Sequence, residues 1–344
     1  MNKSILSVIS LFLLLSSCQN TLDTQTAARI IHIADFSGKT LDRQRHFPLT
    51  RSLALKEGAQ GYIGQIKDIC AIDSNLYLLD AARLSLASFS LQDGKLQNRV
   101  RSLGNGPLEY ILPMALTSDA HHVYLLDMSG MSIIVYDKFL RAQRKIALTF
   151  PCVDFIKMDD GFLCYNLAPA EASGPLVFID REGKVLESFQ VNHRQLSVMT
   201  GGKIFTRNVR EDVFMLPPFS HTVYRWNRQK KQPEEYIRLD FGNKNLPEEM
   251  HGENLNPLEE PYALPTHCFV GKERVLCSFL YGKQRYYTLS APGGEVRTGV
   301  AVSPSQVPFF PQWQVGDILA GTCSTQGNTG QDGEVLLLFD LNGQ

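Results

Sequence analysis

The sequence predicts an all-β protein: a six-bladed β-propeller with four antiparallel strands in each blade. The first observation is a repeat, in which "LYLLD" at Leu76–Asp80 returns 47 residues later as "VYLLD" at Val123–Asp127. The second is that short alternating apolar runs, separated by Asp, Asn and Gly, surround both copies, which is typical of strands joined by tight turns. The third is that six such units follow one another, mostly 44 to 50 residues apart, with no amphipathic helix between them. A repeat of this length is typical of propeller blades.

The units can be followed in order along the chain. The first three carry the innermost strands "IKDICAI", "PMALTSD" and "VDFIKMD", and looser units follow at "DVFMLPPFSHTVYRWN", "HCFVGKERVLCSFLY" and "QWQVGDILAGTC". The repeated Tyr-Leu-Leu-Asp run is the second strand of a blade. Neighbouring blades bury both of its faces, so it is apolar throughout. We expect Asp80 and Asp127 to end these strands by accepting hydrogen bonds from backbone donors in the turn rather than to bind a ligand.

The ring must also be closed. The last unit, Glu334–Gln344, is too short to supply an outer strand, while Ala28–Ala34, "ARIIHIA", reads as an isolated strand at the other end. We therefore expect residues 28–34 to pair with the last blade and cover its open edge.

One segment departs from the blade rhythm. Residues 242–265, "GNKNLPEEMHGENLNPLEEPYALP", form a long insertion between the fourth and fifth blades. Its acidic residues do not follow the spacing of an EF-hand, so we expect a solvated loop. These residues are Glu248, Glu249, Glu253, Glu259 and Glu260.

Residues 1–17 have the form of a bacterial lipoprotein signal peptide. A short basic start precedes an apolar run from Ile5 to Leu15, which is too short for a membrane span. The next residues, Leu15-Ser16-Ser17-Cys18, resemble a lipobox, and this implies a lipid on Cys18 that attaches the protein to a membrane. Gln19 follows in place of the aspartate that usually retains such proteins in the inner membrane. The resemblance therefore implies an outer-membrane lipoprotein of a Gram-negative bacterium, facing the periplasm or the outside.

With this division, residues 18–27 form a tether and residues 28–344 a single propeller domain. Two segments resemble the bacterial six-bladed β-propeller lipoproteins: the first blade with the loop Gly106-Pro107-Leu108-Glu109-Tyr110, and "LPPFSHTVYRWN" in the fourth blade. The resemblance covers nearly the whole mature chain and implies the fold without an assigned activity. Leu108 replaces the family's second glycine. The loop lacks the lysine and helix of a phosphate cradle, so we expect a turn that packs Tyr110 on the blade.

The composition and the motifs of the chain limit the classes of function that it can have. The chain has 34 basic and 35 acidic residues and a formal net charge of −1, which argues against nucleic-acid binding. Neither a zinc or redox cysteine spacing nor a HExxH, GxSxG or EF-hand motif occurs, so we expect no cofactor and no metal. We expect a monomeric binding or scaffold module for a glycan, peptide or partner protein, which the composition favours over an enzyme without deciding the question.

The alternative is a propeller hydrolase or lyase with a metal in the channel. Asp68 and Asp154 occupy similar positions on innermost strands, but the second blade has no acid in register. This pattern gives thin support to a metal site.

Six cysteines follow Cys18. Cys268 and Cys277 should lie directly opposite each other on two strands, as a disulfide or as two buried thiols. For Cys152 and Cys164 we expect a separation of about 15 Å along the strands, which excludes a disulfide.

The working surface is predicted where the turns between second and third strands meet the connections between blades. This face collects aromatic and basic residues, whereas the turns of the opposite face are rich in Asp. An aromatic and polar face suits a sugar or a peptide. The predicted ligand-binding residues are Arg83, Asn105, Glu109, His221, Tyr262, Tyr281, Lys283 and Trp313.

Overall fold

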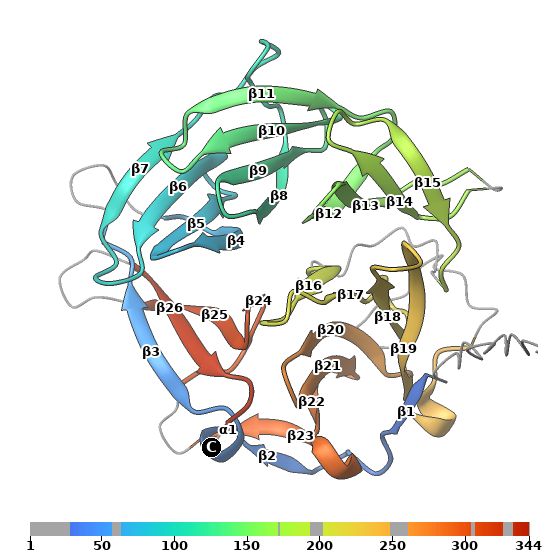
Figure 1. Cartoon of the computed structure of the whole chain (residues 1–344). Coiled ribbons are helices and arrows are strands. Elements are labelled where there is room, and N and C mark those ends of the chain that lie inside the picture. Colours follow the sequence, from blue (N-terminus) through green and yellow to red (C-terminus); the bar gives the residue numbers. More distant parts are fainter. Residues whose placement is uncertain are drawn as a thin grey trace, which may run out of the picture.

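The computed structural model describes residues 28–56, 63–170, 173–192, 202–247, 261–303, 307–325 and 333–343. Their strands form six sheets that stand around a common centre (Figure 1). Each sheet contains four antiparallel strands ordered from the centre outward. These strands are consecutive in the chain in five of the sheets, while the sixth takes its outer strand from the N-terminal part, and two of the sheets gain a fifth, parallel strand. The predicted six-bladed β-propeller is confirmed.

The strands of each blade follow one another from the centre of the ring outward. Blade 1 contains β4 (Ile66–Ile72), β5 (Asn75–Asp80), β6 (Ser85–Ser90) and β7 (Leu96–Val100), and blade 2 contains β8 (Pro113–Ser118), β9 (His122–Asp127), β10 (Ser132–Asp137) and β11 (Ala142–Ala147). Blade 3 contains β12 (Cys152–Met158), β13 (Gly161–Asn166), β14 (Leu176–Asp180) and β15 (Val185–Phe189), and blade 4 contains β16 (Phe205–Arg207), β17 (Val213–Met215), β18 (Thr222–Asn227) and β19 (Gln232–Asp240). Blade 5 contains β20 (Leu264–Val270), β21 (Val275–Tyr281), β22 (Gln284–Ser290) and β23 (Val296–Val302), and blade 6 contains β24 (Trp313–Val315), β25 (Ile318–Thr325), β26 (Gly333–Asp340) and β3 (Leu49–Ala54).

The repeated apolar strands β5 and β9 are buried along nearly their whole length, as predicted for strands covered on both faces. The carboxylate of Asp80, at the end of β5, accepts hydrogen bonds from the backbone N–H groups of Gly64, Gln65 and Ala82 at 3.1–3.2 Å. Asp127 accepts equivalent bonds from backbone donors before β8 and after β9. Both aspartates therefore have the structural role that the sequence predicted.

Ring closure uses a strand from the N-terminal part of the chain, but not the predicted one. β3 pairs antiparallel with β26 and forms the outer strand of blade 6, with Leu53 opposite Leu336. β1 (Arg29–His32), which lies within the segment predicted to close the ring, pairs instead in parallel with β19 of blade 4. That prediction was wrong because outer strands are mostly exposed: only one side chain of β3, that of Leu53, is buried, so apolar content does not identify it.

The N-terminal segment forms a belt around half of the ring. After β1, the strand β2 (Thr40–Asp42) pairs in parallel with β23, the short helix α1 (Arg43–His46) follows, and β3 completes blade 6. Figure 1 shows this belt, drawn in blue, outside blades 4, 5 and 6. Ile31, Ile33 and Phe36 anchor its first part in the core between blades 4 and 5.

Two loops stand out in the sequence. Tyr110 is fully buried and its hydroxyl donates to the Leu84 carbonyl at 2.8 Å, so its loop packs on blade 1 as expected. Residues 242–265 lead from β19 to β20 and begin with a 3-10 turn, Gly242–Lys244. The five glutamates of this insertion, and likewise Cys18 with its signal peptide and tether, lie outside the described residues.

The cysteines give two confirmed predictions and one correction. Cys268 and Cys277 are opposite each other on β20 and β21, as buried thiols with 3.3 Å between their sulfur atoms. Cys152 and Cys164 are free thiols, as expected. They are not far apart, however: both belong to one core cluster, and burial and a hydrogen bond with the Cys152 thiol both raise the pKa of Cys164. The expected separation was wrong because the hairpin turn pairs Cys164 with Phe155, and a bulge follows Cys152.

We predict that two substitutions in the belt will differ sharply in cost. Leu53→Ala removes a side chain that is 3% exposed and packed in the core between blades 6 and 1, and should lower the free energy of unfolding by about 2–4 kcal/mol. Ile30→Ala in β1 removes one that is 51% exposed and should cost less than about 0.5 kcal/mol. Denaturant titration measures both, and equal losses would contradict the assignment of β3 as the closing strand.

Candidate functional site

The propeller presents two faces to a ligand. The connection face carries the turns between second and third strands and the links between blades, such as the Tyr110 loop. The hairpin face, on the opposite side, carries the turns between first and second strands and between third and fourth strands. The sequence predicted binding on the connection face.

Three of the predicted residues lie near the link between blades 1 and 2. Arg83 is in the β5–β6 turn, where its carbonyl accepts a hydrogen bond from Arg101 at 3.0 Å. Asn105 is exposed, and the Glu109 carboxylate accepts from the Gly106 N–H at 2.8 Å. Glu109 therefore shapes its own loop.

Four others lie at blades 4 and 5. His221 Nε2 is 3.2 Å from the Ala263 carbonyl, Tyr262 packs on a small apolar cluster, and Lys283 is exposed. Tyr281 makes an edge contact with Phe36 of the belt, with 5.2 Å between ring centroids.

Trp313, the eighth predicted residue, belongs to the core. It is 4% exposed, packs with Leu53 and Leu336, and lies at the start of the innermost strand of blade 6. The eight residues thus form two separate groups and one core position instead of a single surface.

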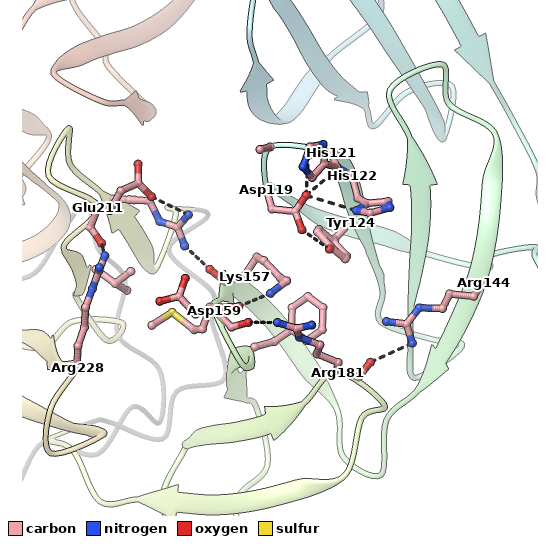
Figure 2. A pocket seen from close by; sticks show the side chains of 15 residues that line it. Asp119, His121, His122, Tyr124, Arg144, Lys157, Asp159, Arg181, Glu211 and Arg228 are labelled. Carbon is pink, nitrogen blue, oxygen red and sulfur yellow. Dashed lines mark hydrogen bonds and ion pairs between the residues drawn. The ribbon is translucent and has the colours of Figure 1, made fainter.

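A basic pocket lies on the hairpin face, at the turns of blades 2, 3 and 4. It has a volume of about 460 Å³, within the range of small-molecule sites. Figure 2 shows cationic and acidic side chains from several turns around one hollow. We call it the basic pocket, and its charged lining residues are Asp119, Arg144, Lys157, Asp159, Arg181, Arg207, Glu211 and Arg228, together with His121 and His122.

Two arginines of the basic pocket, one from blade 2 and one from blade 3, are held by turns of blade 3. Arg144, on the outer strand β11, donates from Nη1 to the Arg181 carbonyl at 3.0 Å. Arg181, in the β14–β15 turn, donates from Nη2 to the Asp159 carbonyl at 2.7 Å (Figure 2). Each bond uses one of five N–H donors of a guanidinium, so the side chain is fixed while other donors still face solvent.

The other cations are fixed in the same way. Arg207, at the end of β16, donates to the Lys157 carbonyl across the boundary between blades 3 and 4. Arg228, in the β18–β19 turn, donates to the Glu211 carbonyl, and the Lys157 ammonium donates to the Met158 carbonyl. Backbone carbonyls thus position cations from three blades without neutralising them.

Carboxylates balance only part of this charge. Five lysine and arginine side chains face three carboxylates in the lining. Arg207 pairs with Glu211 at 3.2 Å, whereas Arg144, Arg181 and Arg228 form no ion pair with any residue that the structure describes. Burial lowers the pKa of Arg207 and of Lys157, so both would gain from a bound anion.

Asp119 is occupied by its own turn. Its carboxylate accepts the N–H groups of His121 and His122, each at 2.8 Å, and the Tyr124 hydroxyl at 2.6 Å. Burial raises the pKa of this carboxyl, but these hydrogen bonds outweigh it and leave the pKa lowered. Asp119 is therefore an ionised structural anchor and not a free acid.

The basic pocket continues into the mouth of the central channel. A second cavity of about 510 Å³, lined by innermost strands, shares Asp119, Ala120, Asp159, Arg207 and Glu211 with it. A ligand could thus extend from the turns towards the axis without leaving the hairpin face.

Below this mouth, Lys203 lies between two buried aspartates. Its ammonium is 2.5 Å from Asp68 Oδ2 on β4 and 3.2 Å from Asp154 Oδ1 on β12, and it also donates to the Leu116 carbonyl on β8 at 2.9 Å. The second blade, which lacks an acid in register, therefore contributes its backbone. Lys203 pairs with both carboxylates that the alternative of a channel metal would need, so both are already engaged with a cation.

The carboxylates are further tied to main chain. Asp68 accepts the Leu116 N–H at 2.6 Å, and Asp154 accepts the N–H groups of Ile204 at 2.7 Å and Phe205 at 3.2 Å. Burial raises the pKa of Asp68, while Lys203 opposes that rise, and the two aspartates raise the pKa of Lys203 despite its burial. The arrangement is a charged structural network.

Metal-ligating clusters and membrane-spanning helices are both missing from the described residues. Among them, no group of three or more His, Cys, Asp or Glu is placed to hold a metal ion. In the same parts of the chain, no helix has the length and apolar character needed to cross a membrane.

Comparison with known proteins identifies relatives by sequence and by fold. The DUF4934 family, a domain of unknown function, matches residues 54–296, well over half of the chain. A search of curated proteins found no significant match. The chain is similar in structure to a "Putative exported protein" of Bacteroides fragilis, with a TM-score of 0.74 and 14% identity over 90% of this chain and 99% of the other.

Two other solved structures resemble this chain with lower TM-scores. A DUF4221 family member from Bacteroides vulgatus gives a TM-score of 0.55 with 10% identity, covering 86% of this chain and 99% of the other. A catalytically inactive virginiamycin B lyase from Staphylococcus aureus with quinupristin gives 0.50 with 11% identity, covering 83% and 87%. At these identities the likeness concerns the fold alone.

We predict that Lys203→Met will lower the free energy of unfolding by about 3–5 kcal/mol near neutral pH, because it leaves two buried carboxylates without their cation. In that variant burial would raise the folded-state pKa of Asp68 further above its unfolded value, so the deficit should shrink as the pH falls and this carboxyl takes up a proton. Denaturant titrations between pH 4 and 8 measure this. Adding Asp68→Asn and Asp154→Asn should recover much of the loss, and a deficit independent of pH would contradict the network.

Proposed function

Because the chain belongs to the DUF4934 family, whose function is unknown, we propose a function from its own site: a cell-envelope binding module that captures an acidic glycan in the basic pocket. The observation that carries this proposal is the set of carbonyl-anchored arginines from three blades, of which Arg144, Arg181 and Arg228 have no carboxylate partner in the described chain. Guanidinium groups fixed in this way suit carboxylate and sulfate groups, which accept two parallel hydrogen bonds.

A glycan fits the pocket better than a peptide for a geometric reason. Peptides commonly gain affinity by pairing their backbone with a free strand edge. The basic pocket is built mainly from hairpin turns, and its polar groups are side-chain cations and carboxylates. Its recognition chemistry therefore addresses charged substituents, as on uronic or sulfated sugars.

The N-terminal sequence supports the proposed location. The apolar run and the lipobox-like Leu15-Ser16-Ser17-Cys18 would direct the chain across the inner membrane and place a lipid on Cys18. Acylation with two or more chains makes a durable anchor. With Gln19 after the cysteine, the protein is an outer-membrane lipoprotein in this proposal, with the propeller held close to envelope glycans.

We predict that Arg181→Gln with Arg228→Gln will weaken binding of polygalacturonate at least about tenfold, because each lost arginine removes charge-assisted hydrogen bonds. The melting temperature should change little, since both side chains lie in surface turns. Titration calorimetry at low salt measures the affinity, which should fall as salt rises for the parent protein.

The matched control is Lys39→Gln with Lys272→Gln, which removes the same charge from two exposed lysines that do not line the basic pocket. If the control loses as much affinity for polygalacturonate as the arginine variant does, the effect comes from net charge alone and the basic pocket is not the binding site. Neutral dextran should not bind. Binding of polyglutamate in preference to polygalacturonate would replace the glycan with an acidic peptide as the ligand.

A further inference from the structure

A further cavity, separate from the basic pocket and from the mouth of the channel, lies on the hairpin face where the belt meets blade 5. It has a volume of about 180 Å³ and does not adjoin the basic pocket. Arg45 and His46 of α1, Arg274 of the β20–β21 turn and Arg297 of β23 surround it. We call it the seam pocket, because it lies between the belt and blade 5. Arg274 also lies against Gly343, near the C-terminal end of the chain.

Positive charge dominates the seam pocket. Arg297 pairs with Glu295 through Nε at 2.7 Å and Nη2 at 2.6 Å, and its Nη1 is 3.1 Å from His46 Nε2. Arg274 reaches only the His46 carbonyl, at 3.4 Å, and neither Arg45 nor Arg274 forms an ion pair with a described carboxylate. Three guanidinium groups thus converge on a cavity that contains one carboxylate.

The nearby arginines affect the protonation of His46. Burial and then Arg297, Arg45 and Arg274 lower the pKa of its imidazole, against a smaller opposing effect of Asp42. The unpaired cations repel one another across a small space, which costs stability unless an anion balances them.

We propose that the seam pocket binds one tetrahedral oxyanion, a sulfate or phosphate group, held by Arg45, Arg274 and Arg297 beside His46. The group is either a free ion or the charged end of a larger ester. Since the seam pocket joins the belt to blade 5, its occupant links the N-terminal segment to the body of the propeller and stabilises the folded ring. This inference is independent of the glycan in the basic pocket, which shares none of these residues.

The test compares the full chain in 10 mM sodium sulfate and in sodium chloride of equal ionic strength. Sulfate should raise the melting temperature of the parent protein by about 2 °C or more. The gain should disappear in Arg274→Gln and remain in Lys272→Gln, which removes one charge from the same turn but does not line the cavity. Arg45→Gln, at an exposed position, serves as the second variant if Arg274→Gln does not fold.

Proton NMR supplies a readout specific to the site. Bound sulfate should raise the pKa of His46, assigned with a His46→Asn variant, so sulfate affinity should increase as the pH falls through that pKa. A phosphate monoester that binds more tightly than sulfate would identify the ester as the occupant, and equal affinities would identify the free ion. An identical sulfate effect in the parent protein, in Arg274→Gln and in Arg45→Gln would overturn the proposal. An unchanged pKa of His46 on addition of sulfate would overturn it as well.

Discussion

Lys203 and its two aspartates are the contact on which the centre of the propeller depends. Two carboxylates this deeply buried would each carry a large desolvation cost alone, and this cost is offset by one shared ammonium group together with backbone N–H donors. Because the Leu116 carbonyl completes the set, one side chain joins the innermost strands of blades 1, 2 and 3 to the start of blade 4. The same ammonium thus fixes the spacing of four of the six blades.

Neutral side chains continue this linkage around the ring. Thr206 of blade 4 donates to the Cys268 carbonyl of blade 5 at 3.3 Å. Gln314 of blade 6 bonds both backbone groups of Val270 in blade 5, at 3.2 and 2.9 Å. The apolar interiors between blades supply most of the burial, while these polar contacts fix each innermost strand at one register. The basic pocket depends on that precision, since its cations come from strands and turns of three blades and are held by backbone carbonyls at the same ends of these blades.

The sequence allowed the fold to be predicted much better than the site. The repeated apolar strand and its closing aspartate follow from local rules, and Asp80 and Asp127 bond as those rules require. The closing strand β3 was missed because an exposed outer strand leaves little pattern. The basic pocket was missed because Arg144, Arg181 and Arg228 are far apart in sequence, and each alone is an ordinary surface cation. Trp313 was misplaced because an aromatic residue at one end of a strand can point to the core as readily as to a ligand.

The direction of the belt relates the proposed N-terminal anchor to the proposed binding site. β1 runs parallel to β19, so the chain enters β1 from the side of the β18–β19 turn, which is the hairpin face. Arg29 accordingly reaches Ser290 and the Ala291 carbonyl at the hairpin end of blade 5. The described chain therefore starts on the same side of the ring as the basic pocket, and in the proposed lipoprotein the anchored segment joins the propeller on that side.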